Sequence, residues 1–130
     1  MQSDYIFVYG TLMRTCPTGA HQTYLANAKF IGTAKVKGNL HRVSYYPALV
    51  LDDAAGWVVG ELYQLTSSAQ LQQLDAYEEC TYPGQPQQEY QRKIVDVQND
   101  EGAVFAAWVY CYQHAVNHLP LIPSGDFLNP

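Results

Sequence analysis

The sequence contains few positive charges. Only seven of its 130 residues are Lys or Arg, against twelve Asp or Glu, and the formal net charge is −5. The seven cations are scattered and form no basic stripe that could neutralise a phosphate backbone, so nucleic acid is not an expected partner. The same scarcity argues against binding to an anionic membrane surface, which attracts clusters of Lys and Arg.

Long apolar runs are absent as well. No stretch approaches the roughly 20 apolar residues that a membrane-spanning helix requires. The first residues, Met1 to Asp4, lack the basic region and the apolar run of a secretory signal peptide. We therefore expect a soluble, cytoplasmic protein without a membrane partner.

Cysteine is scarce and poorly arranged for metal binding. The three residues Cys16, Cys80 and Cys111 are odd in number, lie far apart and form no Cys-x-x-Cys pair. Neither a disulfide framework nor a zinc site is expected, and we predict reduced thiols in a reducing compartment. The four histidines show no His-Glu-x-x-His spacing, so the sequence predicts no metal site.

The remaining composition is that of one folded domain over residues 1–130. Hydrophobic residues make up 48% of the chain and charged residues 15%, a balance that disfavours disorder. A domain of this length buries about two-thirds of the surface of its unfolded chain. A hydrophobic core can therefore form without metal ions or disulfides.

The pattern of residues predicts mostly strands and two helices. Runs of β-branched and aromatic residues indicate strands at residues 5–9, 30–43, 48–51, 57–65, 89–97 and 103–112. Helices are expected at residues 20–28 and 67–79, the second opening on a capping box formed by Ser67 and Gln70. A hairpin turn is expected at residues 99–102 and an irregular tail from residue 114 onward. The predicted fold class is α+β: a single small domain with a mixed, barrel-like sheet.

The loop Tyr9-Gly10-Thr11-Leu12 is the first candidate for chemistry. It follows a buried strand directly, and glycine lets the backbone turn there without a Cβ clash. Successive N–H groups in such a turn can form an anion-binding nest, to which the Thr11 hydroxyl could add a donor. An ordinary strand-to-loop turn explains the same residues.

Glu78 is the second candidate. At the helical spacing of 100° per residue, Leu71, Leu74 and Glu78 share one face, so Glu78 points where the leucines point. Burial raises the pKa of a carboxyl group, and Asp75 and Glu79 are expected to push in the same direction. Such a group can exchange a proton near neutral pH. Alternatively, the helix frays early and Glu78 is solvated.

These segments occur in order with several companions. The companions are Phe7-Val8 ahead of the first loop, Tyr46-Pro47-Ala48-Leu49-Val50, Val59-Gly60-Glu61-Leu62-Tyr63, Leu74-Asp75-Ala76-Tyr77-Glu78, Tyr90-Gln91-Arg92, Trp108-Val109-Tyr110 and Gly125-Asp126-Phe127. Across nearly the whole chain, this ordered set resembles the gamma-glutamylcyclotransferase-like family, especially its short bacterial, AIG2-like and gamma-glutamylaminecyclotransferase members.

The resemblance implies an activity and a site. Enzymes of this family act on gamma-glutamyl compounds, in which the α-amine attacks the side-chain amide, releasing 5-oxoproline and a free amine or amino acid. It implies a small-molecule substrate, no cofactor and no metal, with Glu78 as the acid/base and Tyr9, Gly10, Thr11 and Leu12 binding the glutamyl end.

One departure concerns Glu79, which stands where many family members carry glycine. Helical phase and the spacing after Leu74-Asp75 favour Glu78 over Glu79 as the acid/base. A binding module on the same fold, which holds a small amino-acid-like ligand without turnover, is the alternative; a purely structural interaction domain is a third. The substrate's leaving group and the oligomeric state are left open by the sequence.

Overall fold

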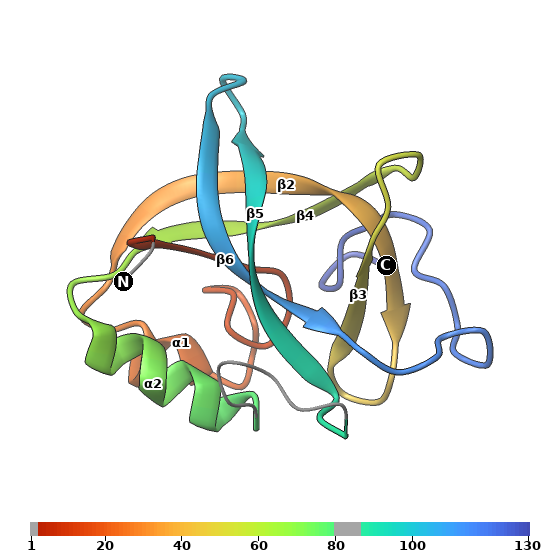
Figure 1. Cartoon of the computed structure of the whole chain (residues 1–130), viewed down its shortest axis with the longest axis horizontal. Helices are drawn as coiled ribbons and strands as arrows, with labels where there is room; N and C mark the ends of the chain where they lie inside the picture. Colours follow the sequence, from red (N-terminus) through yellow and green to blue (C-terminus); the bar gives the residue numbers. More distant parts are fainter. Residues whose placement is uncertain (1–2, 80–86) are drawn as a thin grey trace.

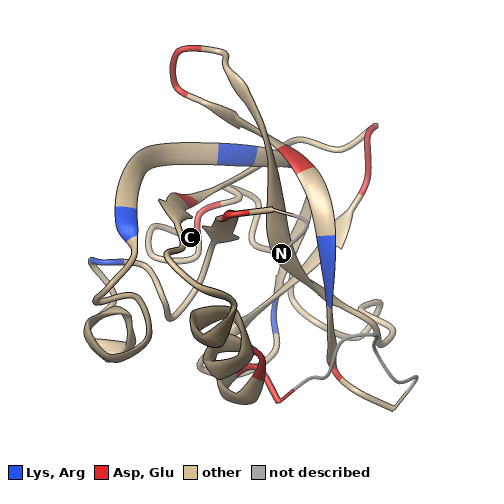
Figure 2. Cartoon of the chain, turned by 60° about the vertical axis from the view of Figure 1, so that its left-hand side comes forward, with Lys and Arg blue, Asp and Glu red and all other residues tan. Residues whose placement is uncertain are grey.

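The computed structural model of the chain describes residues 3–79 and 87–130 (Figure 1). In this part of the chain the elements follow one another as β1 (Tyr5–Val8), α1 (Ala20–Tyr24), β2 (Lys29–Arg42), β3 (Pro47–Leu51), β4 (Trp57–Gln64), α2 (Ser68–Tyr77), β5 (Tyr90–Asn99) and β6 (Val104–Tyr112). Each predicted strand and helix has a counterpart, with ends that shift by up to a few residues. Lys and Arg are spread over several elements, as their scattered positions in the sequence predicted (Figure 2).

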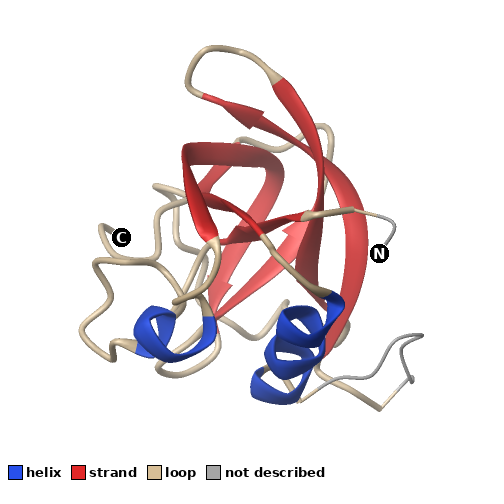
Figure 3. Cartoon of the chain, turned by 90° about the vertical axis from the view of Figure 1, so that its left-hand side faces the viewer, coloured by secondary structure: helices blue, strands red, loops and turns tan. Residues whose placement is uncertain are grey.

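Five strands close into a barrel (Figure 3). They pair in the order β2-β4-β1-β6-β5, and a short pairing of β2 with β5 completes the circle. Strand β3 lies outside this circle and extends the sheet beyond β2. Because β1 and β6 run parallel while the other pairs run antiparallel, the sheet is mixed. The predicted α+β fold with a barrel-like mixed sheet is confirmed.

The apolar runs of the sequence fill the core. Ile6, Phe7 and Val8 of β1 are all buried, which explains why this strand shows no alternation of polar and apolar residues. Strand β2 carries a bulge between Phe30 and Gly32, as its mixture of β-branched residues and glycines predicted. The tail after β6 is irregular and lies on the barrel, where Phe127 is buried.

The two helices lie together on one side of the barrel (Figures 1 and 3). The ring of Tyr24 in α1 lies 4.6 Å from that of Tyr77 in α2. Helix α1 is shorter than predicted, since it ends at Tyr24 rather than at residue 28. Within residues 3–79 and 87–130, no helix has the length and apolar character needed to cross a membrane.

Helix α2 begins as predicted but ends earlier. The Ser67 hydroxyl accepts the N–H of Gln70, whereas the Gln70 side chain accepts from Thr66 instead of Ser67, so the capping box is only half formed. The helix ends at Tyr77, Glu78 is its C-cap, and Glu79 adopts a left-handed φ of 55°. The prediction that the helix continues through residue 79 is therefore wrong. The left-handed residue ends the helix, and the two adjacent glutamates differ in exposure: Glu78 is half-buried and Glu79 is exposed.

Glycine is expected to stabilise this helix end. A residue with a Cβ in the left-handed conformation costs about 1–2 kcal/mol, and replacing it with glycine removes this cost. Glycine also has greater backbone entropy in the unfolded chain, which offsets roughly 0.5–1 kcal/mol of that gain. Glu79→Gly should raise the free energy of unfolding by about 0.5–1 kcal/mol in urea denaturation. Gln73→Gly in the exposed middle of the same helix is the matched control and should lower it by about 1 kcal/mol. Destabilisation by both variants would contradict the left-handed C-cap.

Candidate active site

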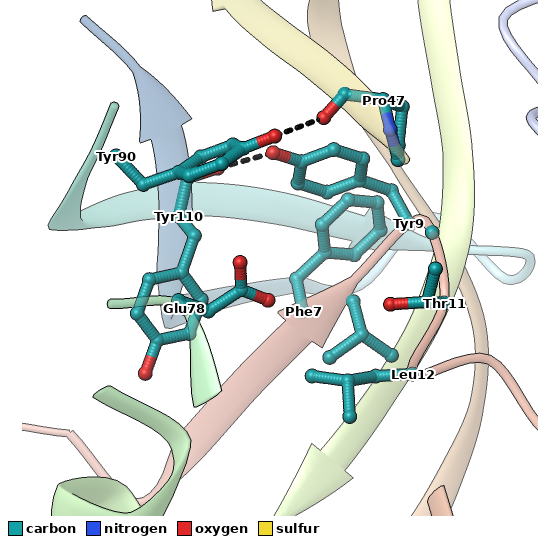
Figure 4. A pocket seen from close by; sticks show the side chains of 10 residues that line it. Phe7, Tyr9, Thr11, Leu12, Pro47, Glu78, Tyr90 and Tyr110 are labelled. Carbon is teal, nitrogen blue, oxygen red and sulfur yellow. Dashed lines mark hydrogen bonds between the residues drawn. The ribbon is translucent and has the colours of Figure 1, made fainter. Parts of the chain in front are cut away.

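One pocket lies at the barrel rim where β1 ends (Figure 4). Because β1 and β6 are parallel, their ends meet at this rim, and the antiparallel β5 starts there. The start of β3 and the end of α2 complete the walls. The lining residues are Phe7, Val8, Tyr9, Gly10, Thr11, Leu12, Pro47, Glu78, Tyr90 and Tyr110. The fold thus brings the loop 9–12 and Glu78, both singled out from the sequence, around one pocket.

The loop after β1 contributes backbone N–H groups. Gly10, Thr11 and Leu12 are buried, and their N–H groups have no hydrogen-bond acceptor among the residues that the structure describes. The N–H of Met13 donates to the carbonyl of Gly10 at 3.0 Å and closes the turn. A buried N–H without an acceptor is rare, because it costs about as much as a lost hydrogen bond. These groups can therefore bind a carboxylate or a developing oxyanion.

Gly10 is required by a close approach rather than by its backbone angle. Its φ lies outside the left-handed region, but a Cβ at this position would lie 2.8 Å from the Cγ and Cδ atoms of Pro47. From the sequence, this glycine was expected to provide the freedom of the turn; the structural reason for it is packing against β3. A side chain here would displace either Pro47 or the loop, both of which line the pocket.

Two buried tyrosines fix the walls. The Tyr9 hydroxyl donates to the carbonyl of Tyr110, and the Tyr90 hydroxyl donates to the carbonyl of Pro47 (Figure 4). The first bond joins the end of β1 to β6, and the second joins β5 to β3. Burial is the largest cause that raises the pKa of both hydroxyls, so both remain protonated donors.

Glu78 supplies the ionisable group of the pocket. It follows the last residue of α2, and its carboxyl group points into the pocket (Figure 4). The residue as a whole is half-buried, but its carboxyl group lies among the pocket walls, and this burial raises its pKa to about 7, with a smaller contribution from the charge of Asp75. No Lys, Arg or His among the described residues forms an ion pair with Glu78. No such cation opposes the rise in its pKa.

Asp75 is held by a buried polar network. Arg92 donates to its two oxygens, from Nε at 2.9 Å and from Nη2 at 3.1 Å, and the Tyr110 hydroxyl donates at 2.7 Å. The Arg92 guanidinium also stacks over the ring of Trp108, 4.0 Å from its centre. This network ties the last turn of α2 to β5 and β6, three residues before Glu78. It therefore fixes where the helix end, and with it the carboxyl group, lies.

Two expectations about the neighbours of Glu78 need correction. Glu79 was expected to raise its pKa together with Asp75, but Glu79 is exposed, and burial and Asp75 are the two causes of the rise. The Thr11 hydroxyl, expected as a free donor, lies 2.7 Å from the Tyr77 hydroxyl and forms a hydrogen bond with it. Thr11 thereby joins the loop after β1 to the end of α2.

Several lining residues were not recognised from the sequence. Pro47, Tyr90 and Tyr110 stand in the ordered motifs noted there, but those motifs carried no role for them. Phe7 and Val8 also stand in these motifs, and as part of a buried strand they were given no role in the pocket. Tyr90 begins β5 and Tyr110 lies near the end of β6. These positions indicate a place at the pocket only once the order of the strands in the barrel is known.

The thiols lie outside the pocket walls where they are described. Cys16 and Cys111 are buried and free. Burial raises the pKa of Cys111 to about 11, so it is not a ready nucleophile. Cys80 lies outside the described residues. Within residues 3–79 and 87–130, no three His, Cys, Asp or Glu side chains gather as metal ligands.

Comparison with known proteins places the chain in a family. The family model described as "Gamma-glutamyl cyclotransferase, AIG2-like" matches residues 6–129. The chain belongs to this family. The gamma-glutamylcyclotransferase family protein YtfP of Escherichia coli (strain K12) is 36% identical over 125 residues, which are 95% of this chain and 96% of YtfP.

Solved structures of the gamma-glutamylcyclotransferase family share the fold. The crystal structure of an AIG2-like protein from Mus musculus superimposes with a TM-score of 0.74 at 27% identity, covering 93% of this chain and 86% of that one. The solution structure of YtfP from Escherichia coli gives a TM-score of 0.64 at 33% identity, covering 96% of each chain.

Asp75→Asn is expected to change both stability and the titration of Glu78. Removing one charge of the buried pair should lower the free energy of unfolding by about 3 kcal/mol. It also removes a negative charge that raises the pKa of Glu78, so Glu78 should titrate below 7.

Urea denaturation and NMR titration of the Glu78 side-chain carbon measure the two effects. Asp96→Asn on the exposed face of β5 is the matched control, since it removes the same charge away from the pocket. A Glu78 titration that is unchanged in Asp75→Asn would show that Asp75 only supports the fold.

Proposed function

We propose that the chain is a cyclotransferase that converts gamma-glutamyl compounds into 5-oxoproline and a free amine or amino acid. The observation that carries this proposal is a carboxyl group with a pKa of about 7 in a pocket that is also lined by Gly10, Thr11 and Leu12, whose N–H groups have no acceptor in the described part of the chain. Membership of the gamma-glutamylcyclotransferase family supports it.

The reaction needs proton transfer between two nitrogen atoms. The α-amine of the substrate is an ammonium group at neutral pH and must lose a proton before it can attack. The amine then forms a bond to the γ-carbonyl carbon, the bond from that carbon to the leaving nitrogen breaks, and the leaving nitrogen gains protons. In the proposal, Glu78 takes the proton from the attacking nitrogen and returns it to the leaving one. Its pKa near 7 suits both transfers.

The loop 10–12 has the complementary role. The γ-carbonyl oxygen becomes negative as the ring closes, and N–H dipoles stabilise that charge without a cation. In a pocket that also holds Glu78, a Lys or Arg would lower the pKa of the glutamate and weaken it as a base. Backbone donors avoid this conflict. Tyr9 and Tyr90, locked by their hydrogen bonds, would hold the substrate in attack geometry, which an intramolecular reaction chiefly requires.

Glu78→Gln is expected to abolish turnover while it preserves the fold. Glutamine has nearly the same shape but cannot transfer a proton, so kcat should fall at least about 100-fold. Glu79→Gln is the matched control and should keep turnover within about tenfold, because Glu79 is exposed and does not line the inner pocket.

The measurement is release of 5-oxoproline from a panel of gamma-glutamyl amines and gamma-glutamyl amino acids, with circular dichroism to check folding. If Glu79→Gln were inactive and Glu78→Gln active, Glu79 rather than Glu78 would be the acid/base. Binding without turnover by the unmodified protein would favour a ligand-binding module on this fold.

The pH dependence should report the carboxylate form of Glu78. As the pH falls through about 7, Glu78 becomes protonated and can no longer accept the substrate proton. The logarithm of kcat/KM should therefore decline with a slope of about one below pH 7. Rate profiles in buffers of constant ionic strength test this. An activity that stays level down to pH 5 would falsify the role of Glu78 as the base.

A further inference from the structure

A second chamber adjoins the pocket of Glu78 on its outer side. It shares Thr11, Glu78 and Tyr90 with the inner pocket. Among the residues that the structure describes, its lining is Thr11, Tyr45, Tyr46, Tyr77, Glu78, Glu79, Glu89 and Tyr90. A substrate whose γ-amide lies beside Glu78, with its glutamyl end held by the loop 10–12, must direct its leaving group into this chamber.

The charges of this chamber all have one sign. Glu79 and Glu89 stand in its walls beside Glu78, and no Lys, Arg or His belongs to the described part of its lining. Figure 2 shows acidic ribbon where helix α2 ends. Lys93 is exposed and outside the lining, and the neighbouring Arg92 is committed to Asp75. A carboxylate in the chamber would face only like charges, whereas an ammonium group would meet opposite ones.

Aromatic rings complete a surface suited to a cation. Tyr45 is 73% exposed, although large hydrophobic side chains are usually covered. Its ring packs edge to face against the ring of Tyr46, with 5.0 Å between the two ring centres. The faces of such rings attract ammonium groups. Glu89 is held in place, because the Tyr46 hydroxyl lies 3.1 and 3.0 Å from its two oxygens and donates to them. A fixed carboxylate beside aromatic faces recognises a cation at low entropic cost.

We propose that this chamber selects gamma-glutamyl compounds whose leaving amine carries a second positive charge and no carboxylate, such as a mono-γ-glutamyl diamine. The inference rests on the proposed function, because only ring closure beside Glu78 makes the chamber a leaving-group site. The bond from the γ-carbonyl carbon to the amide nitrogen breaks, that nitrogen gains protons originating from the attacking amine, and the diamine departs. Gamma-glutamyl peptides, whose leaving groups end in carboxylates, are the disfavoured class.

Three substrates that differ at one end test this selection. They are the γ-glutamyl derivatives of diaminobutane, pentylamine and aminopentanoate, in which the same four-methylene chain ends in an ammonium, a methyl or a carboxylate group. We expect kcat/KM for the ammonium compound to exceed that of the methyl compound at least about fivefold, and the carboxylate compound to fall below it by a similar factor. Added salt should reduce the preference.

Substitution of Glu89 assigns the preference to the chamber. Glu89→Gln keeps an acceptor for the Tyr46 hydroxyl but removes the charge, so the ammonium-to-methyl ratio of kcat/KM should fall about threefold and the carboxylate compound should gain. Glu101→Gln in the exposed hairpin between β5 and β6 removes the same charge at a distance and should leave all three ratios as in the unmodified protein.

The outcomes separate the two proposals. Turnover of all three compounds at equal rates, or a preference for the carboxylate, would overturn the cation chamber and leave the cyclotransferase activity standing. If none of the three compounds releases 5-oxoproline, the proposed cyclotransferase activity is rejected. Calorimetric measurement of the binding of the same compounds then tests whether the chamber selects a cation. Tighter binding of the ammonium compound, weakened by Glu89→Gln, would support the chamber; equal binding would reject it.

Discussion

The buried pair of Asp75 and Arg92 is the interaction on which the site depends. The chain has only seven Lys and Arg residues, and the pair fixes one of them inside the protein against the last turn of α2. Fixing it there has two consequences for Glu78. The end of the helix is tied to β5 and β6 through Arg92 and Tyr110, and the nearby anion raises rather than lowers the pKa of the glutamate. A cation paired with Glu78 instead would have lowered the pKa of its carboxyl group.

The other walls of the pocket come together at the rim of the barrel. A parallel contact between β1 and β6 in an otherwise antiparallel sheet places both strand ends on the same side. The loop after β1 leaves the sheet there, so its N–H groups are not used by a neighbouring strand. The approach of Gly10 to Pro47 keeps this loop against β3, and the bond from Tyr90 to Pro47 holds β5 against the same residue. The pocket thus follows from the strand order and from two short contacts at Pro47.

Much of this arrangement could be predicted from the sequence, and the parts that could not share a physical reason. The buried run of β1, the bulged β2 and the hairpin between β5 and β6 are local patterns, and they were found. The inward direction of Glu78 also followed from helical phase, which is local. The end of α2 was misplaced because a left-handed glutamate at residue 79 is an unusual choice that propensity does not signal.

The hydrogen bonds between residues far apart in the sequence could not be predicted for a different reason. The reach of Arg92 to Asp75 and of Tyr90 to Pro47 depends on the closure of the barrel, which no single segment of sequence encodes. The reason for Gly10 was likewise misjudged, since a close neighbour and a strained φ both select glycine.

The scarcity of cations in the chain also bears on the character of its pocket. Anions in proteins are most often met by Lys or Arg, but here the loop 10–12 lines the inner pocket, and the described walls of the outer chamber carry carboxylates. Dipoles stabilise a charge that develops during a reaction and, unlike a full positive charge, do not strongly hold a carboxylate product. In the proposed reaction, the acidic outer wall would favour protonation of the leaving group, because a departing amine becomes a cation as it gains its proton. The lack of Lys, Arg and His among the described walls would then suit the proposed base, the oxyanion and the leaving group together.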